Sequence, residues 1–212
     1  MRADAMRNRR LLLDAAAAEF AEHGMDVSVA QIAVRAGIGK GTVFRHFATK
    51  EQLITAIFAD QLDGLAAIGE ALLRGTGAGP VAAVRGADAL LAFMSAGVEA
   101  QVGDRAFCQA AGAIARADPQ VRRASQRLAA VAEALTAEAR REGSVRDDVT
   151  GHDIVLLINA ASQATAPLGD TVPGLWRRYL SMMFDGLRPA AAHPLPVPAP
   201  EETHFTSAAH RA

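Results

Sequence analysis

Hydrophobic residues along most of the chain recur every three or four positions, which is the period of a helix with one buried side. The clearest of these stripes runs from Leu53 through Ile57 and Leu65 to Leu72. Alternation of apolar and polar residues, the mark of a half-buried strand, never extends beyond a few positions. The pattern therefore predicts an all-α fold.

Glycine, proline and capping residues divide this pattern into about nine helices. Ser28 is suited to cap the second helix, and Asp118-Pro119 is suited to open the seventh. The predicted helices cover residues 7–23, 28–36, 40–47, 50–74, 80–102, 104–116, 118–141, 150–168 and 174–187.

The segment from Ser28 to Lys50 holds two short helices separated by the tight turn Gly37-Ile38-Gly39, which is the layout of a helix-turn-helix. The second of these helices would bury Val43 and Phe47 and expose polar side chains. Such a helix can enter the major groove of DNA, where its first residues reach base edges and its flanks reach phosphates. The exposed polar residues would be Lys40, Thr42, Arg45 and His46.

Taken alone, the formal net charge of −1 argues against a nucleic-acid partner, but it averages two different parts of the chain. Residues 1–55 carry eight basic and six acidic side chains, a net charge of +2, whereas the remainder carries −3. Residues 27–50 contain four basic side chains and no acidic one. A local cationic segment of this kind can attract phosphates at short range.

Several classes of protein are disfavoured by the composition. Cys108 is the only cysteine, so a disulfide scaffold is excluded. Residues 1–25 lack the apolar core of a signal peptide, and the uncharged stretch Ile154–Gly169 is too short and too polar to span a membrane. Metal-binding, phosphate-loop and catalytic-triad motifs are missing. We therefore expect a cytoplasmic protein that is not an enzyme and uses no cofactor or metal.

The run I-A-x-x-A-G-I-G-K-G-T-V-F-R-H-F-x-x-K-E-x-L, from Ile32 to Leu53, resembles the DNA-binding domain of TetR-family transcriptional regulators of bacteria. Upstream, A-x-x-x-F-x-x-x-G from Ala16 to Gly24 is similar to the family's first helix. Two positions depart from the family pattern. Phe44 stands where the family usually has Tyr, and Gly39 stands where it often has Ser.

This resemblance implies a role in DNA binding for particular residues. Lys40, Gly41 and Thr42 would face base edges, where Lys can donate to guanine and the Thr methyl can touch thymine. Ser28, Phe44, His46 and Lys50 would lie along phosphates, and Arg45 could reach either bases or phosphates. The first arginines would form an arm that precedes the first helix. The full set of expected DNA-binding residues is Arg7, Arg9, Arg10, Ser28, Lys40, Gly41, Thr42, Phe44, Arg45, His46 and Lys50.

Two runs near the end of the chain resemble one subset of these regulators, in which the last two helices pair with their counterparts in a homodimer. They are R-x-D-V-T-x-x-D-I-x-L-L from Arg146 to Leu157 and L-W-R-R-Y-L-S-M-M-F-D-G-L-R-P from Leu175 to Pro189. Residues 154–161 are apolar on more than one side, so that helix must be covered on both. A buried place in a monomer core is the alternative.

These observations divide the chain into three predicted segments. Residues 1–50 are expected to form the DNA-binding domain, and residues 51–188 a helical domain for ligand binding and dimerisation. Five of the nine prolines lie between Pro189 and Pro200, so residues 189–212 are predicted to be a disordered, Pro-rich tail.

The resemblance also implies a small-molecule effector that releases the protein, a repressor, from a palindromic double-stranded operator. Apolar walls with a few polar groups are typical of ligand pockets, although most such side chains are plain core. The candidates are Phe58, Leu62, Phe93, Met94, Phe107, Cys108, Asn159, Gln163 and Trp176. Two alternatives remain open: an interaction module built on a degenerate helix-turn-helix that binds no DNA, and a helical enzyme.

Overall fold

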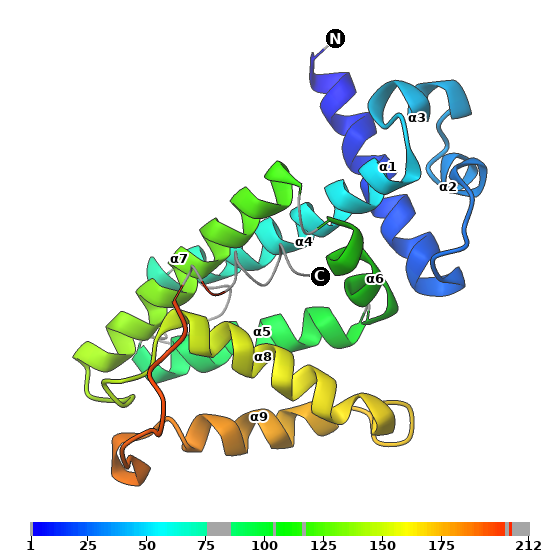
Figure 1. Cartoon of the computed structure of the whole chain (residues 1–212). Coiled ribbons are helices and arrows are strands. Elements are labelled where there is room, and N and C mark those ends of the chain that lie inside the picture. Colours follow the sequence, from blue (N-terminus) through cyan, green and yellow to red (C-terminus); the bar gives the residue numbers. More distant parts are fainter. Residues whose placement is uncertain (1, 76–85, 104, 116–117, 202–203, 205–212) are drawn as a thin grey trace. The chain divides into compact units, whose positions relative to one another are not determined.

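The computed structural model describes residues 2–75, 86–103, 105–115, 118–201 and 204, and these residues form helices and no strand (Figure 1). The predicted all-α fold is confirmed. The helices of the described part are α1 (Arg2–His23), α2 (Val29–Arg35), α3 (Lys40–His46), α4 (Lys50–Leu73), α5 (Gly86–Gly103), α6 (Arg105–Ala115), α7 (Pro119–Arg141), α8 (Gly151–Thr165) and α9 (Leu175–Asp185), with the short 3-10 helices η1 (Ala166–Leu168) and η2 (Pro189–Ala191).

The described residues divide into two compact units. The first takes the chain up to Gln61 together with 103–123, and the second takes 62–102 and everything from Ala124 onward. The helices α4 and α7 therefore contribute one part to each unit. None of the described helices is long and apolar enough to cross a membrane.

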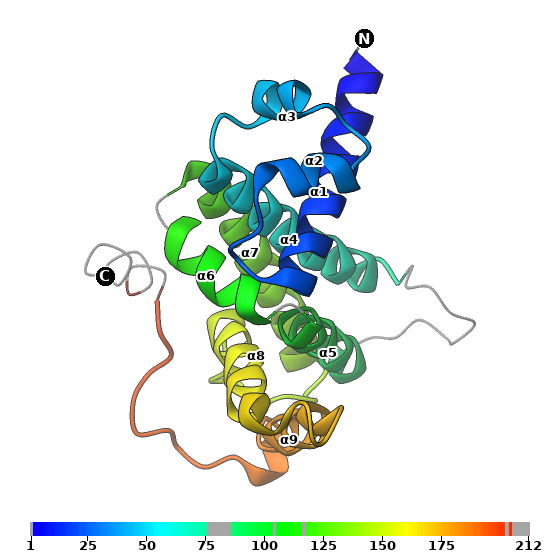
Figure 2. The same cartoon turned by 90° about the vertical axis from the view of Figure 1, so that its right-hand side faces the viewer.

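The first unit is built around the side of α1 that carries Leu12, Ala16 and Phe20, all of which are almost fully buried. The helix α2 packs across α1, and α3 follows it (Figure 2). Phe20 stacks on Phe107 of α6, with ring centroids 5.5 Å apart. The remaining core side chains include Ile32, Ala33, Val43, Phe47, Leu53, Ile54, Ile57 and Ala111.

The first unit extends beyond the predicted DNA-binding segment 1–50. The first half of α4 contributes Leu53, Ile54 and Ile57 to the same core as α1, and α6 contributes Phe107. No pattern in the sequence indicates that a segment 50 residues further along completes this core. Residues 1–50 thus lack part of the apolar surface that stabilises them.

The second unit packs parts of α4 and α7 with α5, α8 and α9. Its core contains Phe93 and Met94 of α5, Ile154 of α8 and Trp176 of α9. The helices α8 and α9 run antiparallel, side by side (Figures 1 and 2). A small residue allows α5 and α8 to approach closely: a Cβ added to Gly97 of α5 would lie 3.0 Å from the Ile158 side chain of α8.

Some predicted bounds differ from the observed ones. The first helix begins at Arg2, five residues before the predicted start, and α8 ends at Thr165, where η1 takes over with Pro167 in its first turn. Proline lacks the N–H that would continue the α-helical pattern. The predicted start of the fifth helix, residues 80–85, and the glycine-rich stop at 76–79 lie outside the described residues.

The beginning of the predicted tail follows a defined course up to residue 201. The Arg146 guanidinium holds Asp148 at 2.5 and 2.8 Å and also donates to the His193 carbonyl at 2.7 Å. The backbone N–H of Arg146 donates to the Leu187 carbonyl at 2.8 Å. Arg146 therefore fixes the chain after α9, while residues 202–203 and 205–212 of the predicted tail lie outside the described part.

Candidate nucleic-acid interface

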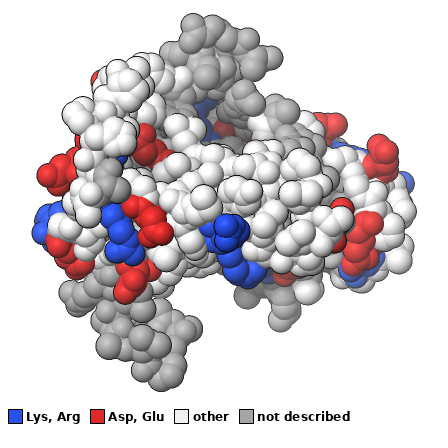
Figure 3. Space-filling view, turned by 90° about the horizontal axis from the view of Figure 1, so that it is seen from below, with Lys and Arg blue, Asp and Glu red and all other residues white. Residues whose placement is uncertain are grey.

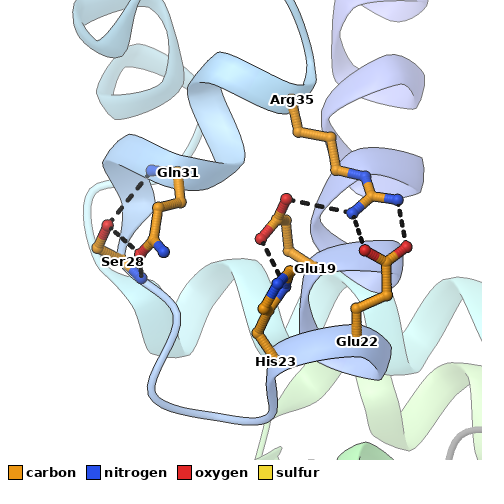
Figure 4. Close-up of polar contacts among 6 residues, drawn as sticks. All are labelled: Glu19, Glu22, His23, Ser28, Gln31 and Arg35. Carbon is orange, nitrogen blue, oxygen red and sulfur yellow. Dashed lines mark hydrogen bonds and ion pairs between the residues drawn. The ribbon is translucent and has the colours of Figure 1, made fainter.

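The predicted cap Ser28 does begin α2, and it forms a capping box with Gln31. The Ser28 hydroxyl accepts from the Gln31 N–H at 3.3 Å, and the Gln31 side-chain oxygen accepts from the Ser28 N–H at 2.9 Å and from its hydroxyl at 2.7 Å. Two backbone donors at the helix start are satisfied in this way. The Ser28 side chain is thus occupied within the protein (Figure 4).

The turn between α2 and α3 depends on Gly37, whose φ of 65° lies in the left-handed region that favours glycine. The N–H of Ile38 donates back to the Ala33 carbonyl at 3.0 Å and closes α2. Gly39 then occupies the N-cap of α3. As glycine has no side chain, the cap hydrogen bond that a serine would make at this position is absent. The layout of a helix-turn-helix is therefore present from Ser28 to His46.

The helix α3 buries one side and exposes the other. Val43 is fully buried, whereas Lys40, Phe44 and Arg45 are exposed and Thr42 is half-buried. The space around Gly41 is open, since a Cβ built there would meet no atom within 4 Å. The Lys40 ammonium lies 5.9 Å from the centroid of the Phe44 ring. His46, also half-buried, ends the helix.

Arg35 is one of the four basic residues between 27 and 50, but its charge is already paired. Its guanidinium bonds both oxygens of Glu22, at 2.5 and 2.7 Å, and one oxygen of Glu19, at 3.2 Å (Figure 4). Hydrogen bonds from Arg35 lower the pKa of the Glu22 carboxyl, and the same contacts raise the pKa of Arg35. The segment that contains no acid is therefore partly neutralised by acids of α1.

Lys50, expected along the DNA phosphates, makes contacts within the protein. Its ammonium donates to the carbonyl of Met25 and lies 5.8 Å from the centroid of the Phe20 ring. These contacts tie the first residue of α4 to α1 and to the loop before α2.

Arg7, Arg9 and Arg10 do not form an arm ahead of the first helix, because all three lie within α1. The prediction of such an arm is wrong, since the helix starts upstream of these arginines. The Arg9 guanidinium lies 5.0 Å from the centroid of the Phe47 ring. Arg10 pairs with Asp14 at 3.0 Å and with Asp60 of α4 at 2.9 Å. The side chain of Arg7 is not among those described.

Lys40 and Arg45 are thus the exposed cations of the helix-turn-helix that form no ion pair with any described residue. The polar partners of Arg35, Lys50 and Arg10 were missed from the sequence. The i, i+3 spacing of Glu19 and Glu22 was the available signal, because it puts both acids on one side of α1.

Comparison with known proteins agrees with this geometry. Residues 12–57 match the sequence model described as bacterial regulatory proteins of the TetR family, and residues 85–189 match that of the C-terminal domain of SbtR-like transcriptional regulators. A TetR transcription regulatory protein from Mycobacterium vanbaalenii is 31% identical, with 88% of this chain and 98% of that chain covered and a TM-score of 0.64. The chain belongs to the TetR family.

Other solved structures of this family have the same fold. A TetR transcriptional regulator from Streptomyces coelicolor is 26% identical over 86% of this chain and 99% of its own, with a TM-score of 0.61. The TetR-like regulator LfrR from Mycobacterium smegmatis, solved in complex with proflavine, is 23% identical over 90% of this chain and 98% of its own, with a TM-score of 0.58. The protein is accordingly a TetR-family transcription regulator with a DNA-binding helix-turn-helix.

The residues that sequence patterns suggested for an effector pocket of this TetR-family chain fall into three groups. Phe58, Phe107 and Cys108 belong to the first unit, where the Cys108 sulfur lies 3.8 Å from the Gln61 side-chain oxygen. A second group lies in the core of the second unit, and it comprises Leu62, Phe93, Met94 and Trp176. Phe93 and Met94 have no exposed surface.

The third group, Asn159 and Gln163, lies on the exposed side of α8. The Asn159 side-chain oxygen accepts from the Gln101 amide at 2.8 Å. Neither amide lies in the core of a single chain. Their place on α8 gives them a surface position instead.

An open cleft of about 490 Å³ exists elsewhere in the second unit, between the turn after α7 and the chain after α9. Val145, Arg146, Asp148 and His193 are among its lining residues, and none of the nine suggested residues is. The Arg146 guanidinium is already paired there with Asp148. Groups of His, Cys, Asp and Glu suited to hold a metal ion are absent from the described residues.

Proposed function

We propose that this regulator is a dimeric repressor, not an enzyme, that binds a palindromic DNA operator and releases it when a small molecule binds the helical body. The observation that carries this proposal is the exposed side of α3, where Lys40 and Arg45 project from a helix-turn-helix without an ion-pair partner among the described residues. Its place of action would be the cytoplasm, where bacterial DNA lies.

The contacts with DNA follow from the exposure of each residue. Lys40, Gly41 and Thr42 begin α3, and the first residues of a recognition helix reach base edges in the major groove. Arg45, Phe44 and His46 come later in the helix and would lie along phosphates. The open space around Gly41 supports this assignment, because a backbone without a side chain can approach a base closely.

The remaining expected residues have weaker support, because each is engaged within the protein. Ser28 would still present the start of α2 to a phosphate, since helix N-termini attract anions. Arg9 is half-buried over Phe47, and Arg10 is paired with two aspartates. Lys50 has two donor hydrogens beyond the one used on Met25. Arg7 is proposed from the sequence alone.

Dimerisation through α8 and α9 is supported by the apolar side chains that this helix pair leaves exposed. Leu156 of α8 and Tyr179 and Met182 of α9 are 44, 40 and 58% exposed. Figure 3 looks onto the side on which α9 lies, and uncharged residues make up most of it. A homodimer carries two copies of α3, as recognition of a palindromic operator requires.

Binding of the effector to the helical body would shift an equilibrium between two conformations of the protein. The suggested core residues Phe93 and Met94 are fully buried in the described conformation. A ligand that contacts them must favour a conformation in which these helices separate, and its effect on DNA binding cannot exceed its differential affinity for the two states.

Selection of bound duplexes from a random DNA library tests the proposal. The expected result is enrichment of one sequence class, with an affinity that falls steeply as salt rises. A folded protein that enriches no duplex at low salt would overturn the proposed function.

A further inference from the structure

Arg35 connects α2 to α1 through a geometry that the proposed DNA contacts do not use (Figure 4). Its two terminal nitrogens bond the two oxygens of Glu22 at 2.5 and 2.7 Å, and one of them also bonds Glu19 at 3.2 Å. Paired N–H groups on one carboxylate fix both distance and orientation, which a lysine ammonium cannot do.

The acidic side of this connection is itself held in place. The Glu19 side chain is 11% exposed, and its second oxygen lies 3.2 Å from the Nδ1 of His23. Glu22 and His23 lie one turn after Glu19 on the last part of α1 (Figure 4). Arg35 therefore binds to a preformed acidic surface of a long helix.

The helices on the other side, α2 and α3, are short. The helix α2 has seven residues and buries Ile32 and Ala33, and α3 has seven residues and buries Val43. Helices this short gain their stability from tertiary contacts. The capping box of Ser28 fixes the start of α2, and Arg35 is its last residue.

The end of α2 leads directly into α3. The N–H groups of Gly37 and Ile38 donate to the carbonyls of Val34 and Ala33 at 3.1 and 3.0 Å, so the turn is built on the last residues of α2. A tilt of this end of α2 would therefore be passed on to the recognition helix.

We propose that Arg35 is a positioning residue for DNA recognition, which sets the direction of α3 by holding the end of α2 on Glu22 and Glu19. It is then not a phosphate contact, although it lies in the basic segment. This inference rests on the proposed function, because it concerns the same interface with DNA.

Removing a negative charge distinguishes the two roles of Arg35. If Arg35 positions α3, Glu22→Gln weakens binding to the duplex that the wild-type protein selects from a random library, by about two- to fivefold. If Arg35 contacts a phosphate, the same variant frees a cation and tightens binding. Asp26→Asn is the matched control: Asp26 is exposed in the neighbouring loop and does not contact Arg35, and its loss leaves binding unchanged or slightly tighter.

Exchange of the two charges gives a second test. Arg35→Glu alone weakens binding to the selected duplex in either case. The double variant Arg35→Glu, Glu22→Arg restores at least part of the affinity if the pair positions α3. A failure to restore any affinity, because position 35 must be positive to meet a phosphate, would overturn the inference.

A loss of folded protein is recognised by a further measurement. Titrations are made below the onset of thermal unfolding, on the selected duplex and on a scrambled one. Mispositioning lowers the ratio of the two affinities, whereas partial unfolding lowers both affinities alike. If the wild-type protein binds no duplex, the proposed function fails; if it binds and Glu22→Gln binds as tightly, only the inference about Arg35 fails.

Discussion

Whether a basic residue contributes to DNA affinity depends on what already holds its charge, because counterion release requires a cation that can reach a phosphate. Arg35 and Arg10 are paired with carboxylates, and the Lys50 ammonium donates to a backbone carbonyl. Lys40 and Arg45 on α3 have no such partner among the described residues. These two side chains should therefore dominate the interface.

Lys40→Ala should relax the base preference of the protein at one position of each half-site. A side chain that reads a base is worth about 1–3 kcal/mol of discrimination, so binding to the preferred sequence falls by that amount. Repeating the random-library selection with the variant measures the change. Arg141→Ala removes the same charge from the end of α7 and should keep the wild-type preference, and an unaltered preference in Lys40→Ala would contradict the assignment.

Lys50→Ala should lower the thermal unfolding temperature. The half-buried ammonium supports the Met25 carbonyl and lies over Phe20, and loss of such a hydrogen bond costs about 1 kcal/mol. Calorimetry checks the shift. If the variant unfolds like the wild type and only the salt dependence of DNA binding changes, Lys50 is a phosphate contact and its role within the protein is minor.

Among the helices, α9 carries large apolar side chains both in the core and on the surface. Trp176, Leu180 and Phe184 recur every four residues and enter the core of the second unit. Tyr179 and Met182 lie on the opposite side and remain exposed. Exposed apolar side chains opposite a core are typical of a helix that meets a second protein surface.

Met182→Glu should convert the protein to a monomer, because it places a charge at the 58%-exposed Met182 in the proposed interface. Sedimentation equilibrium gives the mass directly. Val197→Glu, at an exposed valine after η2, is the control and should leave the dimer intact. A dimer that tolerates Met182→Glu as well as it tolerates the control would place the interface elsewhere.

Helix bounds could be predicted where local signals decide them. The helix α7 begins at Pro119 and ends at Arg141, as Asp118-Pro119 and Gly143 indicate. The start of α1 was missed because residues 2–10 carry charges and little apolar pattern. The composition of the first unit's core depends instead on contacts between distant parts of the chain, since Phe107 stacks on Phe20.

The candidate site, too, could be predicted only in part from the sequence. The spacing of Lys40, Val43 and Phe47 on one helix separates exposed from buried positions correctly. The pairing of Arg35 with Glu19 and Glu22 depends on how α2 crosses α1, and no local pattern specifies that crossing. The same limit applies to Asn159 and Gln163, whose side of α8 faces outward in a single chain.

For the whole molecule, the formal net charge of −1 has a simple physical consequence. The acidic remainder of the chain repels DNA at long range, so the proposed binding would rely on short-range contacts made by α3. One copy of α3 offers few such contacts. Two copies related by a two-fold axis double them and add the requirement for a symmetric site.

Footprinting of the duplex selected from the random library tests this account most directly. A dimer should protect two half-sites related by two-fold symmetry, with centres about 34 Å apart along the duplex or a multiple of one helical turn. Protection of a single asymmetric half-site, or no protection at low salt by a folded dimer, would contradict the account.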